Sequence, residues 1–303
     1  MSGGTYIAPV SLNDVLVAVA AGARPIAGGT DLVVGARHGK APLPEALCAI
    51  HRVRELTGIR EEAGAIVLGA LASHTEITAH PAIRARFSGL ADASAIIGSH
   101  ATRSTGTIGG NVMNGSPAMD TGAPLICLDA VATLASARGS REVAVGDLFV
   151  GPGRTSAEPD ELLTSLLLPA TAAGTGSAYV RLEYRRQMEI AIVGVGCRVT
   201  VSPDGTLSDT RLAITALAPT IHRMSVAEAL LDGSDGGDAA VRAAADAVSG
   251  ASRPISDVRG SEGYRRAMAA VIARRAIRAA LARATGGSVP IPASMAPAGV
   301  LEA

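Results

Sequence analysis

The sequence predicts a two-domain protein of the α+β class. Three observations support this prediction. The chain has 303 residues, 48% of them hydrophobic, which suffices for two ordinary domains or one large one. In its first half, short strand-like and helical patterns surround two glycine pairs. After Pro169, three strand patterns come first and three helical patterns follow, which is typical of an α+β unit.

The N-terminal elements surround the first glycine pair. Ser11 can cap a helix that ends at Gly22, and its apolar residues recur at helical spacing. A short strand is expected over residues 24–27. Gly28-Gly29 then separates this strand from a second helical stretch that begins at Thr30-Asp31. The order strand, glycine pair, helix is therefore expected here.

The central part has shorter patterns. Residues 98–122 are rich in glycine and are expected to be irregular, and an apolar stretch over 123–128 follows. The other expected elements are a strand at 66–71, a helix opening at 75–78, a helix at 91–97, and strands at 130–135 and 141–145.

The second domain is expected after a linker of small and polar residues, 170–176. Pro203-Asp204-Gly205 is a turn signal between two of its strands. Its expected elements are strands at 177–181, 190–201 and 211–217, and helices near 225–232, 237–249 and 261–285. The Pro- and Ala-rich tail after Gly286 is expected to be loosely ordered unless a partner holds it.

Charge and composition argue against several functions. The 27 basic and 27 acidic side chains give a net charge of zero, which argues against binding nucleic acid or an anionic membrane. Only 2% of residues are aromatic, so base stacking is not expected. No apolar stretch is long enough for a membrane span, and no signal peptide is evident. Cys48, Cys127 and Cys197 are too widely spaced for a disulfide or metal site. We expect a cytoplasmic protein.

Each glycine pair could form an anion site. The first lies in Ala27-Gly28-Gly29-Thr30-Asp31, where a strand ends and a helix begins with free N–H groups. The second lies in Thr107-Ile108-Gly109-Gly110-Asn111, and Asp120 downstream can accept bonds from ribose-type hydroxyls. Together the two loops could hold both phosphates of a dinucleotide. For either loop alone, an ordinary tight turn is the alternative.

The other familiar motifs are missing. Gly39-Lys40 is followed by Ala41, so it is not a P-loop, and no G-x-G-x-x-G or G-x-S-x-G is present. The six histidines show no metal spacing, so we nominate neither a catalytic residue nor a metal ligand. The last expected helix carries a basic run that is read as a solvated face, with a docking surface as the alternative: Arg265, Arg266, Arg274, Arg275 and Arg278.

Longer motifs resemble one family. The segment from Tyr6 to Leu32, which ends in Ala-Gly-Gly-Thr-Asp-Leu, is similar to the start of the FAD-binding medium subunit of molybdenum hydroxylases, the xanthine dehydrogenase and carbon monoxide dehydrogenase family. The second glycine motif with Ser116-Pro117-Ala118-Met119-Asp120 resembles the same family. Further similar segments are 55–59, 68–70, 160–163, 177–179, 185–191 and 264–266, so the likeness covers nearly the whole chain.

The resemblance implies an architecture and a set of contacts. It implies an FAD-binding domain of the PCMH or vanillyl-alcohol-oxidase-like type over 1–173, with two α/β subdomains at about 1–57 and 58–173. A small α+β domain over 174–287, with a three-stranded antiparallel sheet and helices, and a tail over 288–303 would follow. The implied pyrophosphate contacts are Ala27, Gly28, Gly29, Thr30, Asp31, Thr107, Ile108, Gly109, Gly110 and Asn111. Asp120 would contact the ribityl or adenosine part, and Ile97 and Leu163 would pack against the flavin. Arg181 stands where relatives often carry Lys, which keeps the charge but changes the hydrogen-bond geometry.

The resemblance also implies a role within a complex. A large molybdenum-cofactor subunit and a small 2Fe-2S subunit would be the partners, in a dimer of heterotrimers. Electrons would pass from the clusters through FAD to NAD, oxygen or quinone. The alternatives are a stand-alone flavin oxidoreductase with the same fold and a non-catalytic scaffold that has lost FAD. The intact pair of glycine motifs argues against the scaffold.

Overall fold

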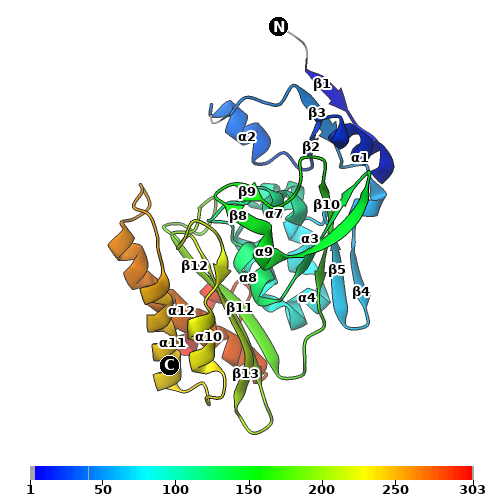
Figure 1. Ribbon diagram of the computed structural model, residues 1–303. Helices are drawn as coiled ribbons and strands as arrows, with labels where there is room; N and C mark the ends of the chain where they lie inside the picture. Colours follow the sequence, from blue (N-terminus) through cyan, green and yellow to red (C-terminus); the bar gives the residue numbers. More distant parts are fainter. Residues whose placement is uncertain (1–3, 40, 302–303) are drawn as a thin grey trace.

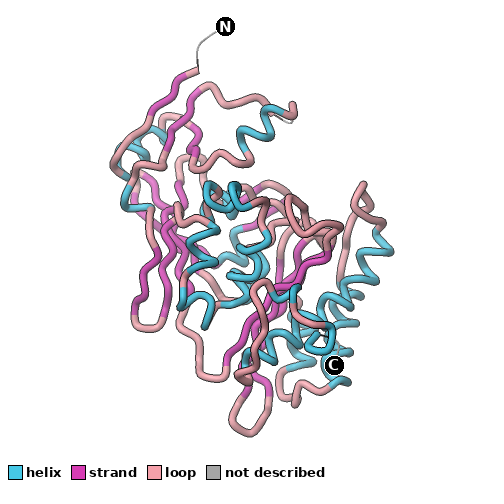
Figure 2. Tube along the Cα trace, turned by 180° about the vertical axis from the view of Figure 1, so that it is seen from behind, coloured by secondary structure: helices cyan, strands magenta, loops and turns pink. Residues whose placement is uncertain are grey.

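The computed structural model describes residues 4–39 and 41–301. In Figure 1 a small sheet lies at the top with the N-terminal end, and two larger sheets lie below it. Seen from behind in Figure 2, helices fill the space between the two larger sheets, and further helices cover the outer face of one of them. We call the chain through residue 168 the N-terminal region and the chain from residue 175 the C-terminal region.

The small sheet is parallel, with the strand order β1-β3-β2. It consists of β1 (Thr5–Ile7), β2 (Arg24–Ile26) and β3 (Ala46–Ala49). Helix α1 (Leu12–Ala20) begins after Ser11, whose hydroxyl accepts a hydrogen bond from the Asp14 N–H, so the predicted cap is confirmed. The short helices α2 (Leu32–Arg37) and η1 (Arg54–Leu56) complete this part.

The second sheet is antiparallel, with the order β4-β5-β10-β6-β7. Its strands are β4 (Ile59–Glu62), β5 (Ala65–Gly69), β6 (Val131–Ser136), β7 (Gly139–Ala144) and β10 (Leu162–Leu168). A separate two-stranded ribbon, β8 (Phe149–Gly151) with β9 (Arg154–Thr155), contacts the chain just after α7. The helices of this part are α3 (His74–Ala79), α4 (Pro81–Arg86), α5 (Ser88–Ile96), α6 (His100–Thr105), α7 (Ile108–Met113), α8 (Gly122–Cys127) and α9 (Val145–Leu148).

The expectation that residues 98–122 are irregular is wrong, because α6 and α7 lie there. Each helix has only six residues, which is less than two turns, so neither shows a helical repeat in the sequence. Ser99 and Thr107 cap them through their hydroxyl oxygens. The apolar stretch after them is also helical, as α8.

The C-terminal region follows the predicted order of strands and then helices. The three predicted strands are antiparallel, and a two-residue strand that the sequence did not predict extends the sheet, in the order β11-β12-β13-β14. The elements are β11 (Thr175–Leu182), β12 (Val193–Val201), β13 (Leu207–Thr215), β14 (His222–Arg223), α10 (Ser225–Leu231), α11 (Asp238–Ala251), α12 (Glu262–Ala284), η2 (Ala293–Met295) and α13 (Ala298–Leu301).

Both faces of the C-terminal sheet are covered. Helices α5 and α8 pack on one face, and α12 packs on the other. Neighbouring residues of β11 show the alternation that this arrangement requires, since Tyr179 lies in the core of the N-terminal region while Ala178 and Val180 lie in the core with α12. The two regions thus share a continuous buried boundary.

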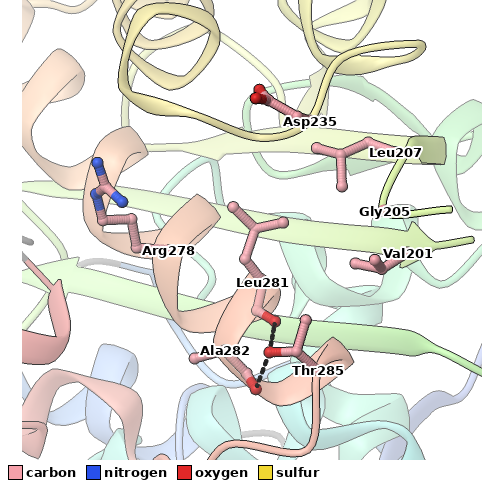
Figure 3. Close-up of a pocket in the computed structure, with 8 residues that line it drawn as sticks. All are labelled: Val201, Gly205, Leu207, Asp235, Arg278, Leu281, Ala282 and Thr285. Carbon is pink, nitrogen blue, oxygen red and sulfur yellow. Dashed lines mark hydrogen bonds between the residues drawn. The ribbon is translucent and has the colours of Figure 1, made fainter. Parts of the chain in front are cut away.

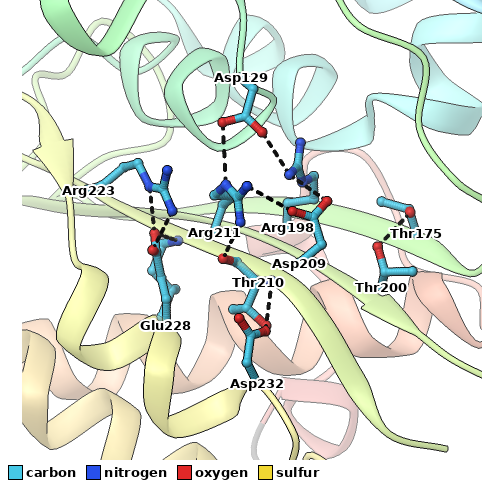
Figure 4. Close-up of polar contacts among 11 residues, drawn as sticks. Asp129, Thr175, Arg198, Thr200, Asp209, Thr210, Arg211, Arg223, Glu228 and Asp232 are labelled. Atoms are coloured by element: carbon cyan, nitrogen blue, oxygen red, sulfur yellow. Dashed lines mark hydrogen bonds and ion pairs between the residues drawn. The ribbon is translucent and has the colours of Figure 1, made fainter.

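Partly buried polar contacts also connect the two regions. Asp129, in the turn between α8 and β6, accepts hydrogen bonds from Arg198 at 2.8 Å and Arg211 at 3.3 Å, and Asp209 pairs with the same two arginines (Figure 4). These contacts hold the end of α8 against β12 and β13.

The tail is packed, so the expectation that it is loosely ordered is wrong for its described residues. Asp92 of α5 is wholly buried and accepts two hydrogen bonds from Arg283, at 2.6 and 2.9 Å. The same carboxylate accepts a bond from the Ala293 N–H at 2.9 Å, and Ala293 is completely buried. Since the buried carboxylate gains partners from α12 and from the tail, the tail is part of the boundary.

Candidate flavin-binding site

The structure brings the two glycine segments together. A Cβ atom added to Gly28 would lie 1.9 Å from the carbonyl oxygen of Thr105, at the end of α6. A Cβ atom added to Gly106 would lie 3.5 Å from the Thr30 hydroxyl. The first loop therefore packs directly against the chain that leads into the second, and Gly28 makes this approach possible because it has no side chain.

The first loop has unused main-chain donors. Among the described residues, none accepts a hydrogen bond from the N–H groups of Gly28, Gly29, Thr30 or Asp31. Gly29 has a φ of 66°, in the left-handed region that favours glycine, and all four residues are at least partly exposed. The Thr30 hydroxyl also lacks a partner within the described chain. This set of free donors fits the pyrophosphate of a dinucleotide, which presents only acceptor oxygens.

The second loop differs from the first, because its main-chain donors are engaged within the protein. The Ile108 and Gly109 N–H groups donate to the carbonyl oxygens of Ala72 and Ala70, both at 2.9 Å. The Gly110 N–H donates to the Thr107 hydroxyl at 3.1 Å, as in a helix cap. The two loops share a glycine pair in the sequence but differ in the hydrogen bonding of their main chain.

The two glycines of the second loop have different surroundings. A Cβ atom at Gly109 would lie 2.7 Å from the Cβ and the carbonyl oxygen of Ala70, so this position requires glycine for close packing. At Gly110 the nearest atom would be the Thr107 hydroxyl at 3.0 Å, and the residue is exposed. Gly110 thus presents bare main chain to the open side of α7, where a ligand could approach.

Asp120 is held by two residues of β11. It is 7% exposed, the Tyr179 hydroxyl donates to its Oδ1 at 2.9 Å, and Arg181 Nη1 donates to its Oδ2 at 2.7 Å. Burial raises the pKa of Asp120 to about 6, although the charge of Arg181 opposes the shift. Tyr179 was not among the predicted site residues. The signal for it was its position two residues before Arg181, which puts both side chains on one face of the strand.

The two predicted flavin-packing residues have different exposure. Ile97 directly follows α5 as its C-cap and is partly exposed. Arg181 Nη2 donates to the neighbouring Ile96 carbonyl at 3.2 Å. Ile97, Arg181 and Asp120 therefore share one neighbourhood. Leu163 lies in the hydrophobic core and is only 2% exposed, so little of its side chain is accessible to a ligand. Both contacts remain predictions.

His74 lies beside these loops and was not predicted to be buried. It is 1% exposed, and its Nδ1 has no partner among the described residues. Its Cδ2 would lie 3.5 Å from a Cβ atom at Gly106. Burial lowers the pKa of His74 to about 4, and the positive charge of Arg103 acts in the same direction. The ring is therefore neutral at physiological pH.

Two cavities lie elsewhere, in the C-terminal region. One, of about 440 Å³, is lined by residues of β12, β13 and α12 (Figure 3), and the other, of about 270 Å³, lies between α11 and α12. None of the predicted site residues lines either cavity. Within the described chain, no three His, Cys, Asp or Glu side chains are grouped so that they could hold a metal ion. None of the described helices has the length and apolar character needed to cross a membrane.

The fold and the free N–H groups of the first loop fit a dinucleotide-binding protein, and comparisons with known proteins identify an FAD-binding oxidoreductase subunit. Residues 2–171 match the family described as "FAD binding domain in molybdopterin dehydrogenase". Residues 178–280 match the "CO dehydrogenase flavoprotein C-terminal domain". The chain therefore belongs to the family of FAD-binding medium subunits of molybdenum hydroxylases, of the carbon monoxide dehydrogenase and xanthine dehydrogenase type.

Individual relatives are similar over almost their whole length. The carbon monoxide dehydrogenase medium chain of Hydrogenophaga pseudoflava is 36% identical over 92% of this chain and 97% of its own. The nicotine 6-hydroxylase medium subunit of Paenarthrobacter nicotinovorans is 30% identical over 92% of this chain and 97% of its own. The solved structure of carbon monoxide dehydrogenase from Hydrogenophaga pseudoflava contains a chain that superposes with a TM-score of 0.88, at 36% identity over 92% of this chain and 98% of that one. Quinoline 2-oxidoreductase from Pseudomonas putida 86 gives 0.85, at 26% identity over 93% and 97%.

Proposed function

We propose that this chain holds FAD on the first glycine loop and acts as the electron-transferring flavin subunit of a larger molybdenum hydroxylase. The observation that carries the proposal is the row of four unpaired N–H groups at residues 28–31, packed against the chain that leads into α7. FAD, when bound, supplies reversible one- and two-electron chemistry, while the protein binds, orients and tunes it.

Each predicted residue has a specific task in this proposal. The pyrophosphate is bound by the donors of the first loop, and α7 forms the opposite wall. Asp120 accepts a hydrogen bond from a ribityl or ribose hydroxyl, and Arg181 holds Asp120 and the end of α5 in place. Ile97 and Leu163 supply apolar contact to the ring system. The assigned residues are Ala27, Gly28, Gly29, Thr30, Asp31, Ile97, Thr107, Ile108, Gly109, Gly110, Asn111, Asp120, Leu163 and Arg181.

The proposed partners are a large molybdenum-cofactor subunit and a small 2Fe-2S subunit, in a dimer of heterotrimers. Relatives that match along most of their length are named as medium chains or medium subunits of dehydrogenases and hydroxylases, which supports a heteromeric complex. In such a complex, bound FAD would supply the electron-transfer chemistry between the iron–sulfur clusters of the partner and NAD, oxygen or quinone as the acceptor. We place the complex in the cytoplasm, since the three cysteines are buried free thiols, as in a reducing compartment.

An absorbance spectrum of the purified full chain, before and after addition of FAD, tests cofactor binding. We expect flavin bands that stay with the protein through gel filtration. If no flavin bands were seen even after addition of FAD, the chain would be a scaffold that has lost FAD. Affinity purification of a tagged chain from its own cells tests the complex, and we expect two partners, one with molybdenum and one with iron–sulfur clusters. A flavin-loaded chain that copurifies with neither would support the stand-alone oxidoreductase.

A further inference from the structure

We propose that Tyr179 is a positioning residue of the flavin site, which holds the carboxylate of Asp120 in one orientation toward the ligand. The assignment rests on the proposed function, in which Asp120 accepts a hydrogen bond from a hydroxyl group of FAD. Tyr179 itself is 1% exposed, so it acts through Asp120 and not by touching the ligand with much of its own surface.

The carboxylate of Asp120 has one donor on each oxygen. The Tyr179 hydroxyl occupies Oδ1 at 2.9 Å, and Arg181 occupies Oδ2 at 2.7 Å. Two donors on different oxygens fix the plane of the group, whereas one donor leaves it free to rotate. A carboxylate has about four lone-pair positions, so acceptor sites remain for a ligand hydroxyl. Because both donors come from β11, the C-terminal region sets the geometry of a residue in the N-terminal region.

Two contacts around Tyr179 fix the position of its hydroxyl. The main-chain N–H of Tyr179 donates to the Asp92 carboxylate at 3.0 Å, which holds β11 against α5. On the neighbouring strand, Gly194 pairs with Arg181, and a Cβ atom at Gly194 would lie 2.2 Å from the Tyr179 hydroxyl oxygen. Gly194 therefore leaves the space that the hydroxyl occupies. Any side chain there must displace the hydroxyl from Asp120.

The hydrogen bond also affects when Asp120 is ionised. Burial raises the pKa of Asp120 to about 6. The charged and titratable groups that face it come from β11 and the residue just after it: Arg181 and Tyr179 lower the pKa, and Glu183 raises it. Removing the Tyr179 hydroxyl removes one stabilising donor from the carboxylate, so ionisation must shift to higher pH. An ionised Asp120 is the better acceptor, so the pH dependence of FAD binding reports on this contact.

The test is a titration of the full apo chain with FAD from pH 5 to 8, followed by flavin fluorescence. For the wild type we expect binding to weaken as the pH falls through about 6. In Tyr179→Phe the midpoint of this loss should move upward by about one pH unit. Gly194→Ala should move it in the same direction. Tyr184→Phe is the matched control, because the Tyr184 hydroxyl bonds to the Arg259 carbonyl at 2.8 Å, in an exposed contact, and its loss should leave the midpoint unchanged.

An unshifted midpoint in Tyr179→Phe would overturn the assignment, even if that variant were less stable, since a purely structural role changes stability without moving the midpoint. If Tyr179→Phe does not fold, an unshifted Gly194→Ala would overturn it equally. A wild-type chain that binds no FAD at any pH would overturn the proposed function itself. The two failures are therefore distinguishable.

Discussion

The two glycine loops share a sequence pattern but differ in what their main chain does. At residues 28–31 the N–H groups have no acceptor among the described residues, whereas the N–H groups of Ile108, Gly109 and Gly110 all donate within the protein. The first loop is thus equipped to bind a ligand through its backbone, and the second is a rigid wall with one open glycine. A glycine pair can therefore serve either the approach of a ligand or internal packing. Which of the two it serves depends on whether neighbouring carbonyl groups accept hydrogen bonds from its N–H groups.

The largest effect is expected at the contact between the loops. Gly28→Ala would place a methyl group 1.9 Å from the Thr105 carbonyl oxygen, and main chain on both sides cannot easily move. We expect a loss of about 3 kcal/mol or more in the free energy of unfolding, together with loss of FAD binding. Urea unfolding checks the first and flavin content the second. Gly146→Ala, where no atom lies within 4 Å, is the control. Wild-type stability in Gly28→Ala would contradict the close packing of Gly28 against the Thr105 carbonyl.

A pH-dependent effect of similar size on the free energy of unfolding is expected from His74, whose ring lies beside Gly106. Its pKa is about 4 in the folded chain and 6.5 in the reference state, so the unfolded chain binds more protons between these values. Stability should therefore fall as the pH falls from 6.5 to 4, by up to about 3 kcal/mol.

The pKa of Asp120 is raised to about 6 in the folded chain, so its protonation stabilises the fold as the pH falls over a similar range. This contribution is present in both wild type and His74→Gln, so the difference between their unfolding free energies reports on His74 alone. The difference between their unfolding free energies should depend on pH in that window. A pH-independent difference for His74→Gln would contradict the burial of a neutral ring.

Substitutions at the two glycines of the second loop should separate ligand binding from packing. Gly110→Val places its side chain on the open side of α7, so we expect FAD affinity to fall at least about a hundredfold, or about 2.7 kcal/mol, with little change in stability. Gly109→Ala should instead destabilise the chain, because its methyl group meets Ala70. Isothermal titration with FAD and urea unfolding measure the two effects. Normal flavin affinity in Gly110→Val would show that the ligand lies elsewhere.

The smallest effect is expected at the two threonines. The Thr107 hydroxyl caps α7, so Thr107→Ala should cost about 1 kcal/mol of stability. Thr30 has no described hydrogen bond, so Thr30→Ala should change stability by less than about 0.5 kcal/mol. Thermal unfolding of both apo variants measures the difference. If both substitutions lowered the free energy of unfolding equally, the Thr107 hydroxyl would not be the structural one and the Thr30 hydroxyl the free one.

Long periodic elements were predictable from the sequence, and short ones were not. The three C-terminal helices were expected near 225–232, 237–249 and 261–285, and they occupy Ser225–Leu231, Asp238–Ala251 and Glu262–Ala284. Helices α11 and α12, with 14 and 23 residues, are long enough for the apolar repeat to be visible in the sequence. Helices α6 and α7 are too short to show one, and β14 has two residues held only by its pairing with β13. Tertiary contact, not local pattern, defines these elements.

The sequence marks the two glycine loops, but it does not reveal which of their N–H groups are hydrogen-bonded within the protein. The glycine motifs mark both loops, yet the acceptors that engage the second loop are the Ala70 and Ala72 carbonyls, more than thirty-five positions earlier in the chain. Likewise Tyr179 meets Asp120 only because β11 packs against the N-terminal region. Such pairings depend on the fold and leave no local signal.

Hydrogen exchange of single amides, measured by NMR on the full chain with and without FAD, tests the comparison most directly. We expect the amides of Gly28, Gly29, Thr30 and Asp31 to exchange rapidly in the apo chain and at least about tenfold more slowly with FAD bound. The amides of Ile108 and Gly109 should exchange slowly in both states, because they are already hydrogen-bonded. First-loop amides that are protected without FAD, or unaffected by its binding, would contradict the account.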